Sequence, residues 1–418
     1  MSASHAELPQ LTSENTTLPS ASLWRKFPYI GLGVGVVCLA LAYILGVSVT
    51  HGGEHGAEGG GESHQQFFLS YLTSFMFWLS ICLGGLFFTL IQHATRAGWS
   101  IVIRRIAENW MAVLPIFALL VVPIFIGQHD LYHWSHGIPA DDLMLNRKAA
   151  YFDSGFYMGR SIFVLVLWIV LSTTLYRWST RQDRTGDERL THKMRWWAPI
   201  GIVVFGLTTT IAAIDWMMSL DPHWYSTIFG VYYFSGIVMA SGAAFILSSM
   251  ALQKSGVLKG AITTEHYHDL GKWTFAFIVF WAYIAFSQFF LIWYANIPEE
   301  AVWFGHRMSH GWEYVSIFLA LGHFVLPLFY LMSRHIKRRR LTLALGVGWL
   351  LFAHYVDIFW LTQPALHEEH FSIHIADLLA LVGLGGIVIG AYAWITARSP
   401  TAPIKDPRLA ESLKFENY

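Results

Sequence analysis

Lysine and arginine fall in every second gap between the hydrophobic segments of this chain, and this alternation limits its possible folds more than any other feature. Ten apolar stretches are long enough to cross a membrane, at residues 29–49, 67–91, 110–127, 155–178, 196–220, 224–252, 272–296, 311–333, 341–361 and 374–397. Of the 27 basic residues, 23 lie on the side that includes both ends of the chain, and the other side holds only Arg147, Lys148, Arg160 and Arg307. The positive-inside rule therefore predicts that both termini are cytoplasmic.

The composition agrees with a membrane protein. Hydrophobic residues make up 55% of the 418 residues and charged residues only 13%, which is too few to cover a soluble protein of this size. We therefore expect an all-α integral membrane fold whose ten transmembrane helices occupy residues 29–397, between cytoplasmic tails at 1–28 and 398–418. The basic residues at 92–109 predict a cytoplasmic loop there.

Two gaps on the other side form long outer loops. The loop at 50–66 holds three histidines and three glutamates among glycines, a composition more typical of a solvated linker than of a metal site. The loop at 128–154 is rich in aromatic residues and histidine, and a loop of this length outside a membrane bundle is usually functional or covered by a partner. We predict that Tyr132 and Trp134 contact a partner subunit.

Two of the spans end in a similar way, which indicates an internal duplication. Asp215 in span 5 is followed by Pro222, and Asp357 in span 9 is followed by Pro364. The two spans are four helices apart, so they run in the same direction through the membrane. This similarity predicts two four-helix bundles, spans 2–5 and spans 6–9, with spans 1 and 10 at the periphery.

Ionisable side chains inside the predicted spans are candidates for function, because burying each one in a bilayer costs at least a few kcal/mol. Five of them lie within about two turns of the outer ends of their helices: Asp215, Glu313, His354, Asp357 and Asp377. The sixth, His323, lies deeper, near the middle of its span. His354 and Asp357 are three residues apart, so they share a helix face and are placed to exchange a proton. The pattern predicts an outward-opening proton path. The structural alternative is that a single carboxylate near a helix end only anchors that helix.

The sequence offers little that would hold a redox group. A transmembrane haem needs two histidines at matching depth, and helical rise separates His323 and His354 by roughly 7 Å in depth. Cys38 and Cys82 both fall inside spans, so neither a disulfide framework nor a thiolate metal site is predicted. Nucleotide-binding loops and metalloprotease signatures are lacking. We predict that the chain holds no metal and no redox cofactor of its own, and no residue can be assigned to quinone binding.

One segment resembles a known family. Residues 215–233 read Asp-Trp-Met-Met-Ser-Leu-Asp-Pro-His-Trp-Tyr-Ser-Thr-Ile-Phe-Gly-Val-Tyr-Tyr. With the ten spans and the duplication, this segment is similar to the ActF-type quinol-oxidoreductase membrane subunit of bacterial alternative complex III, in the polysulfide-reductase (NrfD-like) membrane-subunit family. Carried onto this sequence, the resemblance assigns no catalytic residue and gives proton transfer to Asp215, Glu313, Asp357, Asp377, His354 and His323.

The resemblance also implies a setting for the chain. It implies a subunit of a respiratory complex in the bacterial inner membrane that oxidises menaquinol and passes electrons to cytochrome c or to a terminal oxidase. The implied partners are a sister NrfD-like membrane subunit and periplasmic subunits that carry iron–sulfur clusters and c-type haems. The chain itself would be a scaffold and a proton path, with menaquinone or menaquinol as the only ligand to consider.

Two other functions fit the same pattern. A secondary transporter also has many spans and buried acids, but its helices are usually broken at the midplane, whereas the prolines here lie nearer span ends: Pro115, Pro123, Pro199 and Pro327. A cofactor-free anchor for another periplasmic redox enzyme has spans but needs no proton path. Such an anchor tolerates the loss of Asp357, and a proton path does not.

Overall fold

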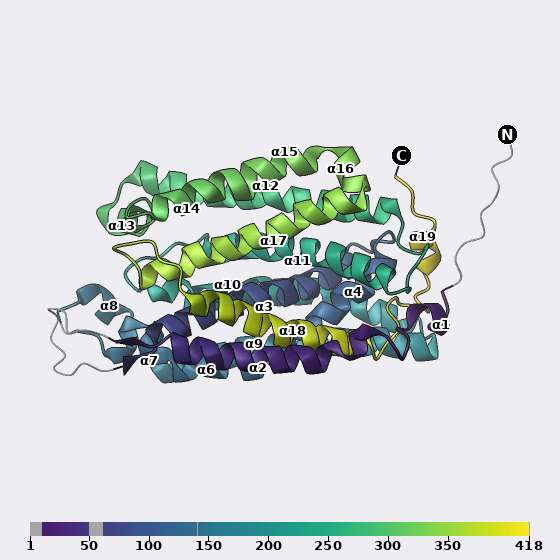
Figure 1. Cartoon of the computed structure of the whole chain (residues 1–418), viewed down its shortest axis with the longest axis horizontal. Helices are drawn as coiled ribbons and strands as arrows, with labels where there is room; N and C mark the ends of the chain where they lie inside the picture. Colours follow the sequence, from purple (N-terminus) through teal and green to yellow (C-terminus); the bar gives the residue numbers. More distant parts are fainter. Residues whose placement is uncertain (1–10, 50–61, 140, 418) are drawn as a thin grey trace.

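The structure, a computed structural model, is a bundle of helices that run roughly along its long axis (Figure 1). It describes residues 11–49, 62–139 and 141–417. Ten of its helical segments are long and apolar enough to cross a membrane. The predicted all-α integral membrane fold with ten spans is confirmed.

The first five spans include one that is interrupted. Span 3 is divided by a 3-10 turn, and the other four each consist of one main helix. The elements are α2 (Phe27–Leu45), α3 (Gln65–Ala94), α4 (Ile101–Met111) with η2 (Leu114–Ile116), α5 (Phe117–Leu120) and α6 (Val122–Ile126), α9 (Ser154–Thr185), and α10 (Arg189–Trp216) with η4 (Met218–Leu220).

The last five spans also include one that departs from a regular α-helix. Span 8 contains a π-helical segment in its middle. The elements are α11 (Phe229–Lys254), α12 (Thr264–Ala295), α14 (Trp312–Phe318) with the π-helix η5 (Leu319–Val325) and α15 (Leu326–Met332), α17 (Arg340–Thr362) with η6 (Gln363–Ala365), and α18 (Ile375–Thr396).

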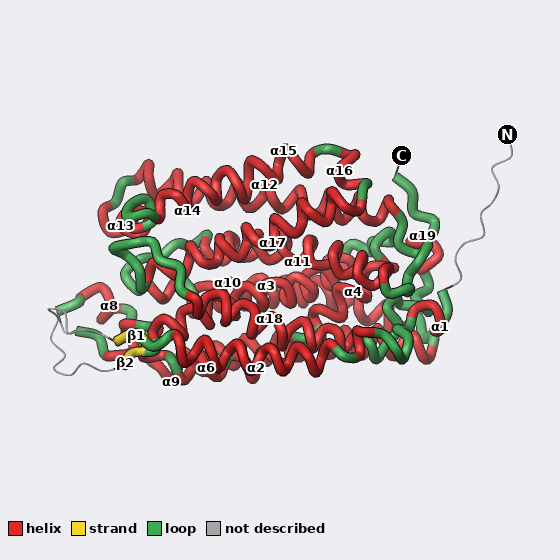
Figure 2. The backbone as a smooth tube through the Cα atoms, in the orientation of Figure 1, coloured by secondary structure: helices red, strands yellow, loops and turns green. Residues whose placement is uncertain are grey.

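Short elements connect the spans at the two ends of the bundle. One end holds α1 (Ser13–Thr16), η1 (Leu23–Arg25), α16 (Arg334–Arg338) and α19 (Leu409–Leu413). The other end holds α7 (Gln128–Leu131), η3 (His133–His136), α8 (Leu143–Arg147), α13 (Pro298–His306) and the antiparallel strand pair of β1 (Ser48–Val49) and β2 (Glu62–Ser63) (Figure 2).

Several helix ends follow directly from the local sequence. The Asp153 carboxylate accepts a hydrogen bond of 2.8 Å from the Phe156 amide and caps the first turn of α9. Gly186, with φ of 70°, ends the same helix in the left-handed conformation. Asn296 ends α12 in the same way with φ of 49°, a conformation that asparagine tolerates better than most residues.

Much of the predicted cytoplasmic segment at 92–109 is helical and not a loop, because α4 already begins at Ile101 and is buried throughout. Charged side chains on α4 pair with one another: Arg104 Nε lies 3.1 Å and Arg105 Nε 2.7 Å from the two carboxylate oxygens of Glu108. Because hydropathy is averaged over neighbouring residues, these three charged residues lower the average and predict a loop. Inside the protein Arg104 also pairs with Asp406 and Arg105 with Asp183, each at 2.7 Å, so the charges are balanced and the helix can be buried.

The two predicted four-helix bundles pack against each other through α3 and α11, which are the most deeply buried spans. Small residues allow this close approach. A Cβ added to Gly84 of α3 would lie 2.2 Å from the Ser241 side chain of α11. Helices in a membrane associate through such close packing, because lipid provides no hydrophobic driving force between them.

Spans 1 and 10 pack against each other at the side of the bundles, as predicted for peripheral spans, and span 10 also packs against α3. Glycines four residues apart line both helices of the pair: Gly31 and Gly35 on α2, and Gly386 and Gly390 on α18. A Cβ on Gly31 would lie 2.2 Å from the Gly386 carbonyl oxygen, so any larger residue must push the helices apart. This is the arrangement by which GxxxG sequences bring helix backbones together.

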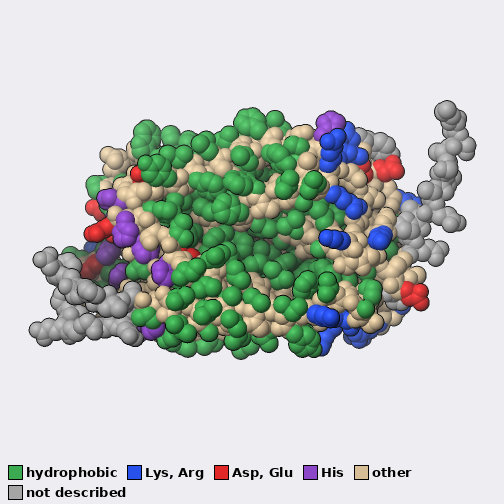
Figure 3. All heavy atoms as spheres, in the orientation of Figure 1, with side chains coloured by type: hydrophobic (Ala, Val, Ile, Leu, Met, Phe, Trp, Pro, Cys, Tyr) green, Lys and Arg blue, Asp and Glu red, His purple; other side chains and the backbone are tan. Residues whose placement is uncertain are grey.

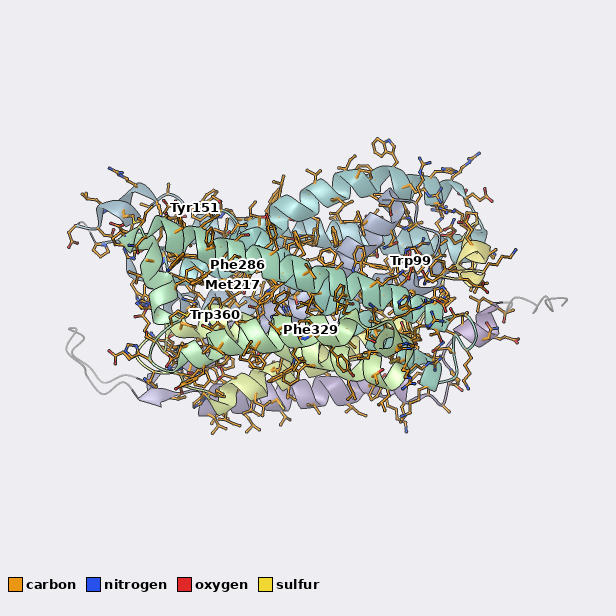
Figure 4. All side chains as sticks on the ribbon, turned by 90° about the horizontal axis from the view of Figure 1, so that it is seen from above. Trp99, Tyr151, Met217, Phe286, Phe329 and Trp360 are labelled. Carbon is orange, nitrogen blue, oxygen red and sulfur yellow. The ribbon has the colours of Figure 1, made fainter. Side chains whose placement is uncertain are left out.

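The two ends of the bundle differ in charge. Lys and Arg gather at the end that holds α1 and α19, which we call the basic end, while His, Asp and Glu gather at the opposite end, with a hydrophobic belt between them on the drawn face (Figure 3). Trp99 lies toward the basic end, and Tyr151, Met217 and Trp360 lie toward the opposite end (Figure 4). Both ends of the described chain are therefore on the basic side.

Residues 398–417 of the predicted C-terminal tail are folded against the basic end. The Thr401 amide donates to the Thr16 carbonyl at 2.9 Å and so joins the two terminal segments. Asp406 accepts from Arg104 of α4 at 2.7 Å. Burial alone would raise the pKa of Asp406, but the Arg104 guanidinium overcomes this effect and holds the pKa below its ordinary value.

Two aromatic side chains of the outer loop at 128–154 do not face a partner subunit, which corrects the prediction that Tyr132 and Trp134 contact one. Tyr132 and Trp134 are buried within the chain itself. The Tyr132 hydroxyl donates to the Trp216 carbonyl and the Trp134 indole to the Ser219 carbonyl, each at 3.1 Å. These side chains cover the end of span 5. Most of the other predicted outer loop, residues 50–61 of 50–66, lies outside the described residues.

Candidate functional site

Asp357 is a buried carboxyl that is held by two hydrogen-bond donors. The Tyr232 hydroxyl of α11 donates to its Oδ1 at 2.5 Å, and the Trp281 indole of α12 donates to its Oδ2 at 3.0 Å. In the part of the chain that the structure describes, Asp357 forms no ion pair. A buried carboxyl without a cation removes its charge by taking up a proton.

His354 lies on the same face of α17 as Asp357, as the spacing predicts. Its Nε2 is 3.0 Å from the Ser80 hydroxyl of α3, and that hydroxyl donates to the Phe77 carbonyl at 2.6 Å. Since the serine proton is used in this way, we assign the imidazole proton to Nε2 and the acceptor role to Nδ1. Among the described residues Nδ1 has no hydrogen-bond partner, so a basic nitrogen is held unused inside the membrane.

His323 is buried inside the π-helix η5, and it too has unused hydrogen-bonding capacity. Neither of its ring nitrogens has a partner in the described part of the chain. Its ring packs against the Trp281 indole with the centroids 4.1 Å apart, and it lies 6.5 Å from the His354 ring, centroid to centroid. π-Helical segments inside α-helices are rare and often mark functional sites.

We call these side chains the Asp357 group: Asp357, Tyr232, Trp281, His323, His354 and Ser80. The direct hydrogen bond between His354 and Asp357 that the sequence suggests is not formed, because the carboxyl is turned toward α11 and α12. Trp281 and Ser80 are not among the residues that the sequence identifies. No local spacing identifies these two, since they reach Asp357 and His354 from other helices.

Asp215, the counterpart of Asp357 in the duplication, is engaged very differently. Arg160 of α9 contacts both of its carboxylate oxygens at 3.0 Å, and the Tyr151 hydroxyl donates to Oδ1 at 2.7 Å. The guanidinium also lies over the Tyr151 ring, 3.8 Å from its centroid. A bidentate arginine of this kind holds the carboxylate in one orientation. This supports a structural role for Asp215 rather than proton exchange.

Asp377 lies in another polar group, at the start of α18. Its Oδ1 accepts from the Ser70 hydroxyl at 2.5 Å and from the amides of Gln66 and Gln363 at 3.3 and 3.2 Å. Its Oδ2 accepts from the His374 backbone amide at 2.8 Å, which completes a capping box at this helix start. So many local donors indicate that Asp377 holds the ends of α3 and α18 together.

Glu313 is not part of either group. It lies in the first turn of α14 and is half-buried, and its carboxylate accepts from the Gly311 amide at 2.7 Å. A carboxylate at this place satisfies a free N–H group at the start of a helix and interacts favourably with the helix dipole. The six predicted residues therefore separate into one group of three and three single carboxylates with local partners.

Arg307 fixes the backbone just beyond the Asp357 group. Its guanidinium donates to the carbonyls of Trp360 and Leu361 at the end of α17, at 3.1 and 3.0 Å, and to the Trp303 carbonyl at 2.9 Å. Its plane also lies over the Trp303 ring, 3.5 Å from the centroid. Burial lowers the pKa of Arg307 to about 9. Arg307 thereby satisfies two of the last carbonyls of α17.

A cavity of about 430 Å³ lies against the Asp357 group and is lined mainly by residues of α12 and η5. Tyr232 and Trp281, the two donors to Asp357, form part of its wall. Among the described residues, no group of three or more His, Cys, Asp or Glu side chains is arranged to hold a metal ion. The chemistry that the arrangement itself supports is proton exchange among a carboxyl, a phenol and two imidazoles.

The segment at 215–233 contributes to the surroundings of both Asp215 and Asp357. It contains Asp215 itself, and it also contains Tyr232, whose hydroxyl donates to Asp357. Comparison of the sequence with protein-family models gave no match, and comparison with curated proteins gave none either. The contacts of the Asp357 group are therefore the basis for any statement about function.

Proposed function

We propose that this chain is a membrane subunit of a respiratory complex that oxidises a quinol, and that it carries protons through the Asp357 group. The observation that carries the proposal is a buried carboxyl that has hydrogen-bond donors but, among the described residues, no cation, together with two buried imidazoles whose nitrogens lack partners there, one of them packed on the Trp281 donor. Ionisable groups arranged in this way inside a membrane are typical of proton relays. The class of complex rests on the resemblance of residues 215–233 to alternative complex III subunits.

In this proposal Asp357 and Tyr232 exchange a proton over their 2.5 Å hydrogen bond, and His323 and His354 pass it deeper into the membrane. The two imidazole rings are 6.5 Å apart between centroids, a gap that one bridging water can span. The fixed pair of Asp215 and Arg160 takes no part in this transfer. It supports the first bundle.

The proposed setting follows the same resemblance. The basic end faces the cytoplasm of a bacterial inner membrane, so the Asp357 group lies toward the outer side. A sister NrfD-like subunit and periplasmic subunits with iron–sulfur clusters and c-type haems would supply the electron path, and this chain would supply none of it.

The test is the variant Asp357→Asn in the assembled complex. It keeps the shape of the side chain and removes its proton, so we expect slower quinol-driven turnover or loss of coupled proton movement, with the haem content unchanged. Glu369→Gln serves as the matched control, because Glu369 is an exposed acid in the loop after α17. Wild-type turnover and coupling in Asp357→Asn would leave the chain the role of an anchor.

Secondary transport is the second candidate, and the interrupted spans favour it. Span 3 is broken at Leu114–Ile116, and span 8 changes to a π-helix at Leu319–Val325. Transporters often place substrate sites at such breaks. Solute-dependent proton uptake by vesicles that contain only this chain would support transport, and a requirement for the other subunits would support the respiratory complex.

A further inference from the structure

A groove lies between the peripheral spans 1 and 10 and the first bundle. It has a volume of about 520 Å³, and its walls come from α2, span 3, α9 and α18, which run along the same side of the molecule (Figure 1). Small residues of span 3 and α18 leave the space open, among them Ala112 and Ala391. Much of the remaining lining is aliphatic, including Leu32, Ile116 and Ile387. The described side chains therefore do not close the gap between the peripheral spans and the first bundle.

The groove covers the depth of one leaflet of the bilayer. Along α18 its lining runs from Ile387 to Ile395, and eight residues of helix rise about 12 Å. One leaflet of the hydrocarbon core is about 15 Å thick, since the whole core is about 30 Å. Leu32 and Trp394 are 56% and 47% exposed, so the groove opens sideways to the bilayer. A space of this depth fits an acyl chain of one leaflet, whereas a partner's spanning helix has to cross both leaflets.

Two cations lie at the end of the groove that is nearer the basic end. The Tyr176 hydroxyl is 2.9 Å from the Ser399 hydroxyl, just beyond the end of α18, and Arg177 is the next residue of α9 and lines the groove. The Arg398 guanidinium lies over the Trp394 ring, 3.5 Å from its centroid. Both arginines are exposed, and neither forms an ion pair with a described residue. Their charges are therefore available to an anion from outside the chain.

We propose that the groove binds an anionic phospholipid from the leaflet at the basic end, which the positive-inside rule predicts to be cytoplasmic. Its phosphate lies against Arg177 and Arg398, and one acyl chain lies along Leu32 and Ile387. Arginine binds phosphate through paired hydrogen bonds, and basic pockets between spans on the cytoplasmic side recognise anionic headgroups. A zwitterionic lipid fits less well, because it brings a cation of its own to the two arginines. The bound lipid joins the peripheral spans to the first bundle, and no residue of the groove belongs to the Asp357 group.

The experiment is native mass spectrometry of the detergent-purified protein during titration with lipid. The probes are palmitoyl-oleoyl phosphatidylglycerol, phosphatidylcholine with the same chains, and glycerol phosphate, which has an anionic headgroup without chains. We expect one phosphatidylglycerol to bind about 30-fold more tightly than phosphatidylcholine, which corresponds to about 1 kcal/mol for each arginine near the membrane surface. Equal binding of the two lipids would show an unspecific lipid contact only, and would overturn the proposal. Tight binding of glycerol phosphate would show a site for free phosphate instead, with the same consequence.

A charge variant and its matched control localise the site. Arg177→Gln/Arg398→Gln removes both cations at the groove, so phosphatidylglycerol should bind no more tightly than phosphatidylcholine. Arg334→Gln/Arg339→Gln removes the same number of exposed arginines from the basic end, outside the groove, and should keep the wild-type preference. Equal loss of the preference in the two double variants would attribute it to the net charge of the basic end, and would overturn the site.

A variant that fills the groove tests its apolar part. Ala391→Trp places a large side chain in the space and should abolish the preferential binding of phosphatidylglycerol. Wild-type binding in a folded Ala391→Trp protein would overturn the proposed place of the lipid. If this variant does not fold, the arginine variants decide alone, because they change only exposed side chains. Cross-linking of Ala391→Cys, and not of the parent chain, to another polypeptide in membranes would show that a protein helix fills the groove, and would also overturn the proposal.

Discussion

The Arg160–Asp215 pair gives the sharpest prediction about what holds the first bundle together. Arg160→Met removes the cation but keeps much of the apolar stem. It leaves the Asp215 carboxylate buried with the Tyr151 hydroxyl at 2.7 Å as its one remaining side-chain partner among the described residues. Breaking a buried pair in this way costs roughly 3–5 kcal/mol. Because the Arg160 side chain is 14% exposed and can be partly replaced by water, we expect a value near the lower limit.

The double variant Arg160→Met/Asp215→Asn separates charge from packing. It removes both charges, so we expect it to be more stable than Arg160→Met alone, with a coupling of about 2 kcal/mol, or roughly 30-fold in the unfolding equilibrium. Arg147→Met is the control, because Arg147 is an exposed cation on the same side of the membrane. It should lie within about 0.5 kcal/mol of wild type.

The assay is reversible unfolding of the detergent-solubilised chain, followed by tryptophan fluorescence at increasing denaturant. Single-variant losses that simply add in the double variant would show that the two residues do not depend on each other. That result would refute the structural role assigned to Asp215 and return it to the candidates for proton transfer.

Three further predictions concern the rest of the chain. Gly31→Leu should separate α2 from α18, because a Cβ there already meets the Gly386 carbonyl oxygen at 2.2 Å, and cross-linking between the two helices should fall while the two main bundles stay folded. A membrane-impermeant thiol reagent applied from outside should modify His136→Cys but not Arg184→Cys, and the reverse pattern would invert the topology. The purified chain alone should show no haem Soret band, and a haem retained in equal amount would contradict the assignment of all redox groups to partners.

Much of the fold could be predicted from the sequence, because it depends on properties that each segment carries alone. Span length and the distribution of basic residues predict the ten helices, and the matching ends at Asp215 and Asp357 predict the two bundles. The start of α4 could not be found in this way. Arg104 and Arg105 meet Asp406 and Asp183 only after the chain has folded, so a local average of hydropathy assigns these charged residues to a loop.

The candidate site could be predicted only in part, for a similar reason. Asp357, His354 and His323 were identified as buried ionisable residues, and the structure brings them together with Trp281 and Tyr232. The segment Leu319–Val325 is a π-helix, which has about one residue more per turn than an α-helix. Depth in the membrane, counted from the helix end with the α-helical rise, is therefore a poor guide to how near His323 and His354 lie.

The side chains from other helices that contact the site residues could not be predicted from the sequence, for a different reason. Arg160 is 55 positions from Asp215, and nothing in their spacing shows that they meet. The same holds for Ser80 and His354, which are 274 positions apart. Which carboxyl receives a cation depends on how each helix is rotated in the bundle, and this rotation is set by packing across the whole molecule.

The central claim is that Asp357, and not Asp215, takes up and releases a proton. The most direct measurement is an infrared pH titration of the chain reconstituted in lipid, since a protonated carboxyl has a C=O stretch that a carboxylate lacks. We predict a buried carboxyl band that appears and disappears with pH, is lost in Asp357→Asn, and is retained in Asp215→Asn. A titrating band that persists in Asp357→Asn, or that is lost in Asp215→Asn, would contradict the account.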